Sequence, residues 1–231
     1  MFVAVPGPRS PQRRWAVPLL ATALCLAFLW WLSQPDTARQ SLWLNWGALA
    51  DGSLLRVQDW WPALHDGSVL RLFSALFLHA DWLHLLGNLI FLLIFGLPAE
   101  RQLGPWRLLL LFLCGGAASN AAAMIAVDRP DHIIIGASGA VSALVGTYLV
   151  LFPGTRLGVV LPLGIFLEFV RAPAYLLIGV WALMQVLFAY IGPSLGQVAW
   201  WAHVAGMLFG CCYALLVRNA VRRRVRQRSG Y

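Results

Sequence analysis

The sequence predicts an all-α membrane protein, a bundle of six transmembrane helices with a membrane-associated first outer loop. Of its 231 residues, 60% are hydrophobic and only 11% are charged. Soluble domains typically carry about a quarter charged residues. The apolar residues also form long blocks instead of amphipathic stripes, which favours lipid as the solvent for most of the chain.

The first predicted helix covers about residues 15–32 and follows a basic N-terminal tail, residues 1–14. This block is long enough to span, lacks a small-residue cleavage site at its end and precedes further spans. We therefore interpret it as an uncleaved helix and not as a signal peptide. The loop of about 33–79 that follows contains Trp43, Trp46, Trp60 and Trp61 among acidic residues. Such a composition is typical of membrane-surface structure on the non-cytoplasmic side.

The remaining membrane domain, which ends at about residue 217, contains five further apolar blocks. They predict helices over about 81–97, 105–127, 138–152, 172–191 and 200–217. Gly and Pro residues mark the start of the third helix and the end of the fourth. The apolar segment 157–170 is short and contains Pro162, so we expect it to lie at the interface or to re-enter the membrane. A basic tail, residues 218–231, closes the chain.

The distribution of arginine predicts the orientation. Six spans place both termini on one side, and only Arg39, Arg56, Arg71 and Arg129 then lie on the other. The remaining 13 of the 17 basic residues lie on the side of the termini, which is the bias expected for cytoplasmic termini. A seventh span over 157–170 would put the basic tail outside. The net charge of +8 thus reflects membrane topology, and no nucleic-acid partner is expected.

Polar residues gather at one predicted depth. The second, fourth and sixth spans all run inwards, so their first turns lie in the outer half of the bilayer. The second span carries His84 and Asn88 there, the fourth carries Ser138 and the sixth carries His203. The fourth span has only about fifteen residues, so its helix is roughly 22 Å long, whereas the hydrocarbon core of a bilayer is about 30 Å thick. Ser138 therefore lies below the outer membrane surface. The non-helical chain before it must be buried in protein or must line a water-filled cavity. Hydrolysis would need that water.

Ser138 and His203 each allow two interpretations. A serine in Gly-Ala-Ser-Gly (136–139) is often a packing residue, but at a helix start it meets free N–H groups that suit an oxyanion. His203 could bond a carbonyl, or it could activate the serine. Small residues on both helices permit this approach: Gly206 and Gly210 on one, and Ser138, Ser142 and Gly146 on the other.

His84 and Asn88 are four residues apart and share one helical face. They could steady an oxyanion or form interhelical hydrogen bonds, and by spacing alone His84 is also a candidate base. Asp81 at the interface is the nearest carboxylate, so the pattern fits a Ser–His dyad better than a triad. The four Cys have no metal-type spacing, and we expect neither a metal site nor a cofactor.

Four motifs together resemble the rhomboid family. Gly-Ala-Ser-Gly at 136–139 resembles its nucleophile motif, and Ala-His-x-x-Gly at 202–206 resembles its general-base motif. The run 79–88, from His79 to Asn88, is similar to its second-helix signature, and 100–104 resembles the turn that follows. The resemblance covers roughly residues 65–217.

This resemblance implies a rhomboid-like bundle that is an intramembrane serine endopeptidase. Ser138 would be the nucleophile and His203 the general base. His84, Asn88 and the Ser138 backbone N–H would form the oxyanion hole. The implied substrates are transmembrane proteins, cleaved in or near their helices within the lipid bilayer. The fifth span and the loop 192–199 are candidates for a gate and a cap.

Two positions depart from the family pattern. Arg71 corresponds to the Arg of a Trp-Arg motif, but here Leu70 precedes it. Ser142 stands where some relatives have an aromatic residue packed against the base, so His203 must be oriented by another group.

Three alternatives remain. A catalytically inactive rhomboid-like protein that binds membrane clients would be expected to have lost the serine or the histidine, and both are present. A small-solute transporter would show intramembrane charges or an inverted repeat. A purely structural bundle leaves the shared depth of four polar groups unexplained.

Short loops and the lack of a targeting extension favour a bacterial inner membrane, with the active site open to the outer side. The sequence does not predict an oligomeric state.

Overall fold

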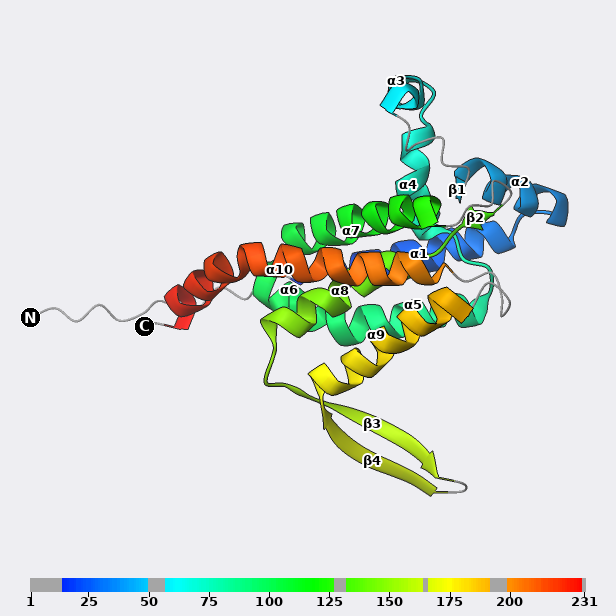
Figure 1. The fold of residues 1–231 in the computed structure, drawn as a ribbon. Helices are drawn as coiled ribbons and strands as arrows, with labels where there is room; N and C mark the ends of the chain where they lie inside the picture. The colour runs from blue at the N-terminus through cyan, green and yellow to red at the C-terminus, as the bar shows by residue number, and fades with distance from the viewer. Residues whose placement is uncertain (1–13, 50–56, 127–131, 164–165, 192–198, 230–231) are drawn as a thin grey trace, which may run out of the picture.

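The computed structural model describes residues 14–49, 57–126, 132–163, 166–191 and 199–229, which form a mostly helical bundle (Figure 1). Two small antiparallel sheets accompany the helices. One pairs β1 (Ala48–Leu49) with β2 (Ile133–Ile134), and the other pairs β3 (Arg156–Leu163) with β4 (Phe166–Pro173). The all-α prediction is therefore right for the bundle and wrong for these two sheets.

The helices follow the predicted blocks closely. In chain order they are α1 (Ala16–Leu32), α2 (Asp36–Trp46), α3 (Val57–His65), η2 (Ser68–Leu70), α4 (Arg71–Ser74), η3 (Ala75–Phe77), α5 (Trp82–Phe91), η4 (Leu92–Gly96), α6 (Leu97–Leu103), α7 (Pro105–Ala126), α8 (Ser138–Leu151), α9 (Ala174–Ile191) and α10 (Trp200–Ser229). The predicted second span continues through η4, a π-helical turn, to Leu103. The predicted sixth span continues to Ser229, because its basic tail is rich in the good helix former Arg.

Within the described ranges, four helical segments are long and apolar enough to cross a membrane: Trp82–Leu103, Pro105–Ala126, Ala174–Ile191 and Trp200–Val221. The apolar helices α1 and α8 are shorter, at 17 and 14 residues. Every residue of α8 from Gly139 to Tyr148 is buried. Protein therefore surrounds α8, and its short length needs no match to the thickness of a bilayer.

Glycines bring α8 and α10 into backbone contact. A Cβ at Gly210 of α10 would collide with the carbonyl oxygen of Ala143, and one at Gly146 of α8 would collide with that of Met207. The Thr147 hydroxyl donates to the Gly210 carbonyl across the same interface, at 3.0 Å. The predicted contact between the small faces of these helices is thus confirmed.

Both ends of α1 are held by the α5–α6 segment. Glu100 of α6 is fully buried, and its carboxylate accepts hydrogen bonds from the backbone N–H groups of Ala16 (2.9 Å) and Val17 (3.1 Å). These groups have no partner within their own helix. At the other end, Phe28 packs edge-on against Trp82, with ring centroids 4.8 Å apart. Helix α1 therefore runs antiparallel to α5 and α6.

We expect the Glu100→Ala variant to lose about 2–4 kcal/mol of unfolding free energy, because two buried N–H groups lose a charged acceptor. Glu100→Gln keeps one acceptor oxygen and should lose less. Denaturation of the purified protein in mixed micelles measures both. Equal stability of the wild type and Glu100→Ala would show that this cap contributes nothing.

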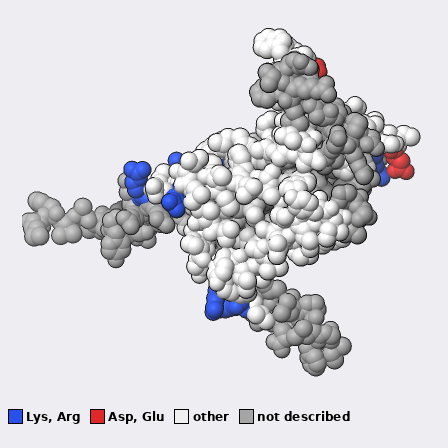
Figure 2. Space-filling view, viewed as in Figure 1, with Lys and Arg blue, Asp and Glu red and all other residues white. Residues whose placement is uncertain are grey.

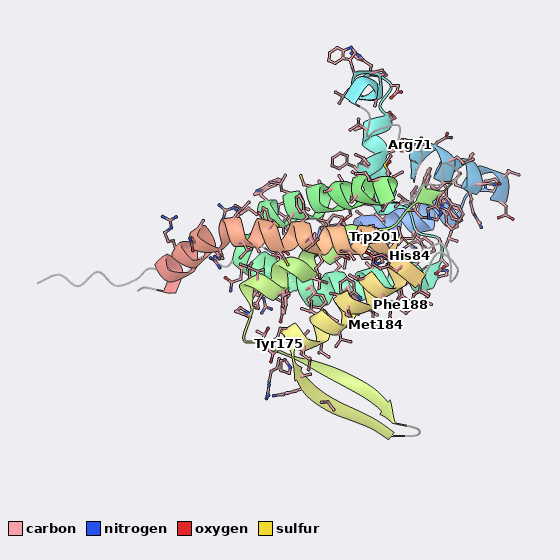
Figure 3. All side chains as sticks on the ribbon, viewed as in Figure 1. Arg71, His84, Tyr175, Met184, Phe188 and Trp201 are labelled. Atoms are coloured by element: carbon pink, nitrogen blue, oxygen red, sulfur yellow. The ribbon has the colours of Figure 1, made fainter. Side chains whose placement is uncertain are left out.

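The segment predicted as an outer loop contains α2 to η3, and it is tied to the chain that leads into α8. Ser74 donates to the Trp46 carbonyl (2.7 Å), and the Gly136 N–H donates to the Ala75 carbonyl (2.8 Å). Arg71, labelled in Figure 3, lies on α4, outside the bundle's centre, and the preceding Leu70 is exposed. Leu70, which stands where the family motif has a Trp, thus faces away from the core.

The segment 157–170 forms most of the hairpin β3–β4, which projects from the bundle between α8 and α9 (Figure 1). The prediction that it does not form a transmembrane helix is confirmed, but its β structure was not predicted. Pro162 disfavours a helix here, and Val159 and Val160 favour a strand.

Candidate active site

The first turns of α5, α8 and α10 meet at one end of the bundle. In Figure 3, His84 of α5 lies at the same end as Trp201 of α10. The chain leading into α8 touches α5 directly, since a Cβ at Gly136 would lie 2.5 Å from His84 Nε2. Residues that are distant in the sequence are therefore neighbours here, as their common predicted depth suggested.

Ser138 is the first residue of α8, and its hydroxyl forms a hydrogen bond with His203 of α10. The distance from Ser138 Oγ to His203 Nε2 is 2.8 Å. Gly206 permits this approach, because a Cβ added there would collide with the carbonyl oxygen of Gly139. Gly136, with φ of +112°, makes the turn that places Ser138 at the helix start, and such a backbone favours glycine.

The other ring nitrogen of His203 is held by α9. Its Nδ1 lies 2.7 Å from Oε1 of Gln185, a side chain that is only 6% exposed. An amide oxygen accepts but cannot donate, so this contact is a hydrogen bond in the tautomer that carries its hydrogen on Nδ1. The neutral ring then presents the lone pair of Nε2 to the Ser138 hydroxyl, which donates to it.

Aromatic rings enclose the imidazole. Trp181 of α9 lies nearly parallel to the His203 ring, with centroids 6.4 Å apart and an interplanar angle of 28°. Trp200 approaches it edge-on at 6.0 Å. Ser142 donates to the Ser138 carbonyl at 2.7 Å. Gln185 and Trp181 thus contact His203 from α9, while position 142, where some relatives have an aromatic residue, holds a serine.

His84 is fixed by its own helix start and by a second histidine. Asp81 caps α5, and its Oδ1 accepts the His84 backbone N–H at 2.8 Å. The His79 ring packs edge-on against the His84 ring, 5.0 Å between centroids. His79 is 1% exposed, and burial, with a smaller effect of His84, lowers the pKa of His79 to about 3. His79 is therefore a neutral packing partner near neutral pH.

Asn88 follows His84 by one helical turn and is 6% exposed. Within the part of the chain that the structure describes, its Nδ2 has no hydrogen-bond partner. A buried donor without a partner costs about 1–3 kcal/mol, so such a group calls for an explanation. A bound group that accepts a hydrogen bond would provide one.

The arrangement brings Ser138, His203 and His84 to one end of the bundle, with Asn88 one helical turn after His84. It also adds two residues that the sequence reasoning missed. Those two are Gln185 and Trp181, both on α9. Gln185 is the one carboxamide in the otherwise apolar Ala174–Ile191 helix. A strongly polar side chain inside a predicted span is itself a signal of function, and it could have identified Gln185 from the sequence.

These features define a helical integral membrane protein with a partly buried serine–histidine hydrogen bond at the meeting point of α8 and α10. Comparison with protein-family models then identifies the family: the model for the Rhomboid domain matches residues 66–220. The match covers well over half of the chain, which therefore belongs to the rhomboid family.

Curated relatives come from plants, bacteria and animals. "RHOMBOID-like protein 6, mitochondrial" of Arabidopsis thaliana is 27% identical over 188 residues, 75% of this chain and 55% of that protein. "Putative rhomboid protease YdcA" of Bacillus subtilis (strain 168) is 37% identical over 90 residues, 38% of this chain and 45% of that protein. "Rhomboid-related protein 1" of Caenorhabditis elegans is 28% identical over 169 residues, 67% of this chain and 42% of that protein. The chain thus spans about half the length of these relatives.

Proposed function

We propose that this protein is an intramembrane serine endopeptidase that cleaves peptide bonds in or near transmembrane helices of membrane proteins. The observation that carries the proposal is the 2.8 Å hydrogen bond between Ser138 Oγ and His203 Nε2. A serine hydroxyl is a weak nucleophile until a neighbouring base takes its proton. Membership of the rhomboid family and the relative named as a rhomboid protease support the same reaction.

The proposed reaction has two steps. Ser138 Oγ attacks the scissile carbonyl carbon while its proton moves to His203 Nε2, and His203 then gives that proton to the leaving amine. Water subsequently attacks the acyl-enzyme ester, loses a proton to His203 and releases the carboxylic acid, and the proton returns to Ser138. No metal or cofactor takes part in these steps.

The developing oxyanion would be stabilised by His84, Asn88 and the Ser138 backbone N–H. The last of these lies at the start of α8, where N–H groups lack helical partners. Nδ2 of Asn88 has no partner in the described part of the chain, which supports this role, because an oxyanion would supply its acceptor.

In the proposed topology α1 and α8 join the four longer spans to give six, with both termini in the cytoplasm. Figure 2 supports the orientation: basic residues gather at the end where α10 finishes and at the base of the hairpin, whereas the acidic residues in view lie at the other end, with some basic side chains beside them. The site would then open to the outer side of a bacterial inner membrane.

We expect the Asn88→Ala variant to lower kcat by about 10- to 1000-fold with little change in stability, because Nδ2 has no hydrogen-bond partner among the described residues. Asn120→Ala is the matched control. Asn120 Nδ2 donates to the Leu72 carbonyl at 2.8 Å, so this change should lower stability and spare the chemistry. Cleavage and melting assays measure both variants. A loss of stability without a loss of kcat in Asn88→Ala, with the opposite result in Asn120→Ala, would show that Asn88 is not part of the oxyanion hole.

The proposal as a whole is tested with the full chain in liposomes that contain a single-span model substrate. We expect the substrate to be cleaved, and we expect a fluorophosphonate probe to label Ser138, as located by peptide mass spectrometry. A folded protein that neither cleaves several substrates nor reacts with the probe would contradict the protease function. That result would favour the client-binding alternative.

A further inference from the structure

We infer that Gln185 is a positioning residue that fixes the tautomer and the orientation of His203. This inference rests on the proposed function and adds a third member, on α9, to the Ser138–His203 pair. Its amide oxygen lies 2.7 Å from His203 Nδ1, while His203 Nε2 lies 2.8 Å from Ser138 Oγ. The three side chains therefore form one continuous chain of hydrogen bonds across α9, α10 and α8.

The chemistry of this chain depends on which ring nitrogen carries the hydrogen. A neutral imidazole has two tautomers, and only the form with hydrogen on Nδ1 leaves Nε2 free to accept the serine proton. The oxygen of Gln185 selects that form, since it can accept the Nδ1 hydrogen and has none to give. A wrongly protonated ring would offer Ser138 a donor in place of a base.

An amide suits this place better than a carboxylate. The side chain is 6% exposed, and an ionised group there would carry a large desolvation cost unless it were paired. A carboxamide orients the ring through a neutral hydrogen bond and brings no buried charge into the resting protein. The sequence offers no carboxylate at this depth, and Gln185 supplies the orientation without one.

A simple packing role accounts less well for Gln185. Helix α9 lies at the edge of the bundle, and its buried residues are Ala174, Ile178 and Gln185. Its neighbours Met184 and Leu187 are exposed, and Met184 is labelled on the outer side of α9 in Figure 3. A large polar side chain is thus turned inward from an apolar helix, and its partner is the nitrogen of the candidate base.

The test compares two substitutions and a control in the full-length protein. Gln185→Met keeps the length of the side chain and removes the acceptor, and Gln185→Glu keeps an acceptor oxygen at the same reach. Leu187→Ala alters an exposed residue two positions away on the same helix. Cleavage of the single-span substrate gives kcat and KM, and the rate of fluorophosphonate labelling reports the nucleophilicity of Ser138 directly.

We expect Gln185→Met to lower kcat and the labelling rate by roughly 10- to 100-fold at unchanged KM. Gln185→Glu should recover most of that loss, and Leu187→Ala should match the wild type. Nitrogen-15 NMR of histidine-labelled protein adds a readout that packing would not move. The His203 signal, assigned by its absence from a His203→Ala variant, should show hydrogen on Nδ1 in the wild type and mixed tautomers in Gln185→Met.

Wild-type rates and an unchanged tautomer in Gln185→Met would overturn the positioning role while leaving the protease function intact. Equal losses in Gln185→Met and Leu187→Ala would also overturn it, since they would point to a general effect on α9. A wild-type protein that shows neither labelling nor cleavage would contradict the protease function itself, and the positioning role with it.

Discussion

Replacing Ser138 by Ala is expected to lower the rate of substrate cleavage by about 10⁴- to 10⁶-fold, the largest effect that we predict. The variant has no hydroxyl to attack the carbonyl, and His203 Nε2 loses the group that lies 2.8 Å from it. His203→Ala should cost a similar factor, because the hydroxyl then keeps its proton at neutral pH.

The two losses are not expected to multiply. Nucleophile and base act in the same proton transfer, so removing either one already removes the step. The double variant Ser138→Ala/His203→Ala should therefore be about as slow as the slower single variant. Cleavage assays in liposomes, with melting curves to verify folding, measure this comparison.

Two outcomes would contradict this prediction. Cleavage by Ser138→Ala at the wild-type rate would mean a different nucleophile or a contaminating protease. A double variant slower by the product of the single losses would mean that Ser138 and His203 act independently, although they share a hydrogen bond.

The second large effect concerns the α8–α10 interface. We expect Gly210→Ala to lower the unfolding free energy by about 3 kcal/mol or more, since the new methyl group collides with the Ala143 carbonyl oxygen. The new methyl carbon is a Cβ and its neighbour is a backbone oxygen, so no side-chain rotation relieves the contact. The helices must separate, and the hydrogen bond from Thr147 to the Gly210 carbonyl lengthens.

Gly179→Ala is the matched control for this prediction. Gly179 lies on α9, and among the described residues no heavy atom beyond its own helix backbone and chain neighbours comes within 4 Å of a Cβ placed there. The same change at this position should be neutral or stabilise the helix by about 1 kcal/mol. Denaturation in mixed micelles measures both variants, and similar midpoints for Gly210→Ala and Gly179→Ala would refute the close helix contact.

The sequence by itself determined the helices and the family motifs, because both are local properties. Long apolar blocks with Gly and Pro at their ends predicted α7, α8 and α9 to within about two residues. The alternating direction of successive spans also predicted that Ser138, His203, His84 and Asn88 lie at one end of the bundle.

Only the tertiary structure decided the contacts between distant segments. Glu100 caps α1, whose first residue lies 84 positions earlier in the sequence. Gln185 of α9 contacts His203, which lies 18 positions later on α10. No local pattern encodes such a pairing, because it depends on the rotation of each helix about its axis. The hairpin β3–β4 was missed for a related reason: a short apolar run has no periodicity that separates strand from helix, and pairing with a second strand settles the choice.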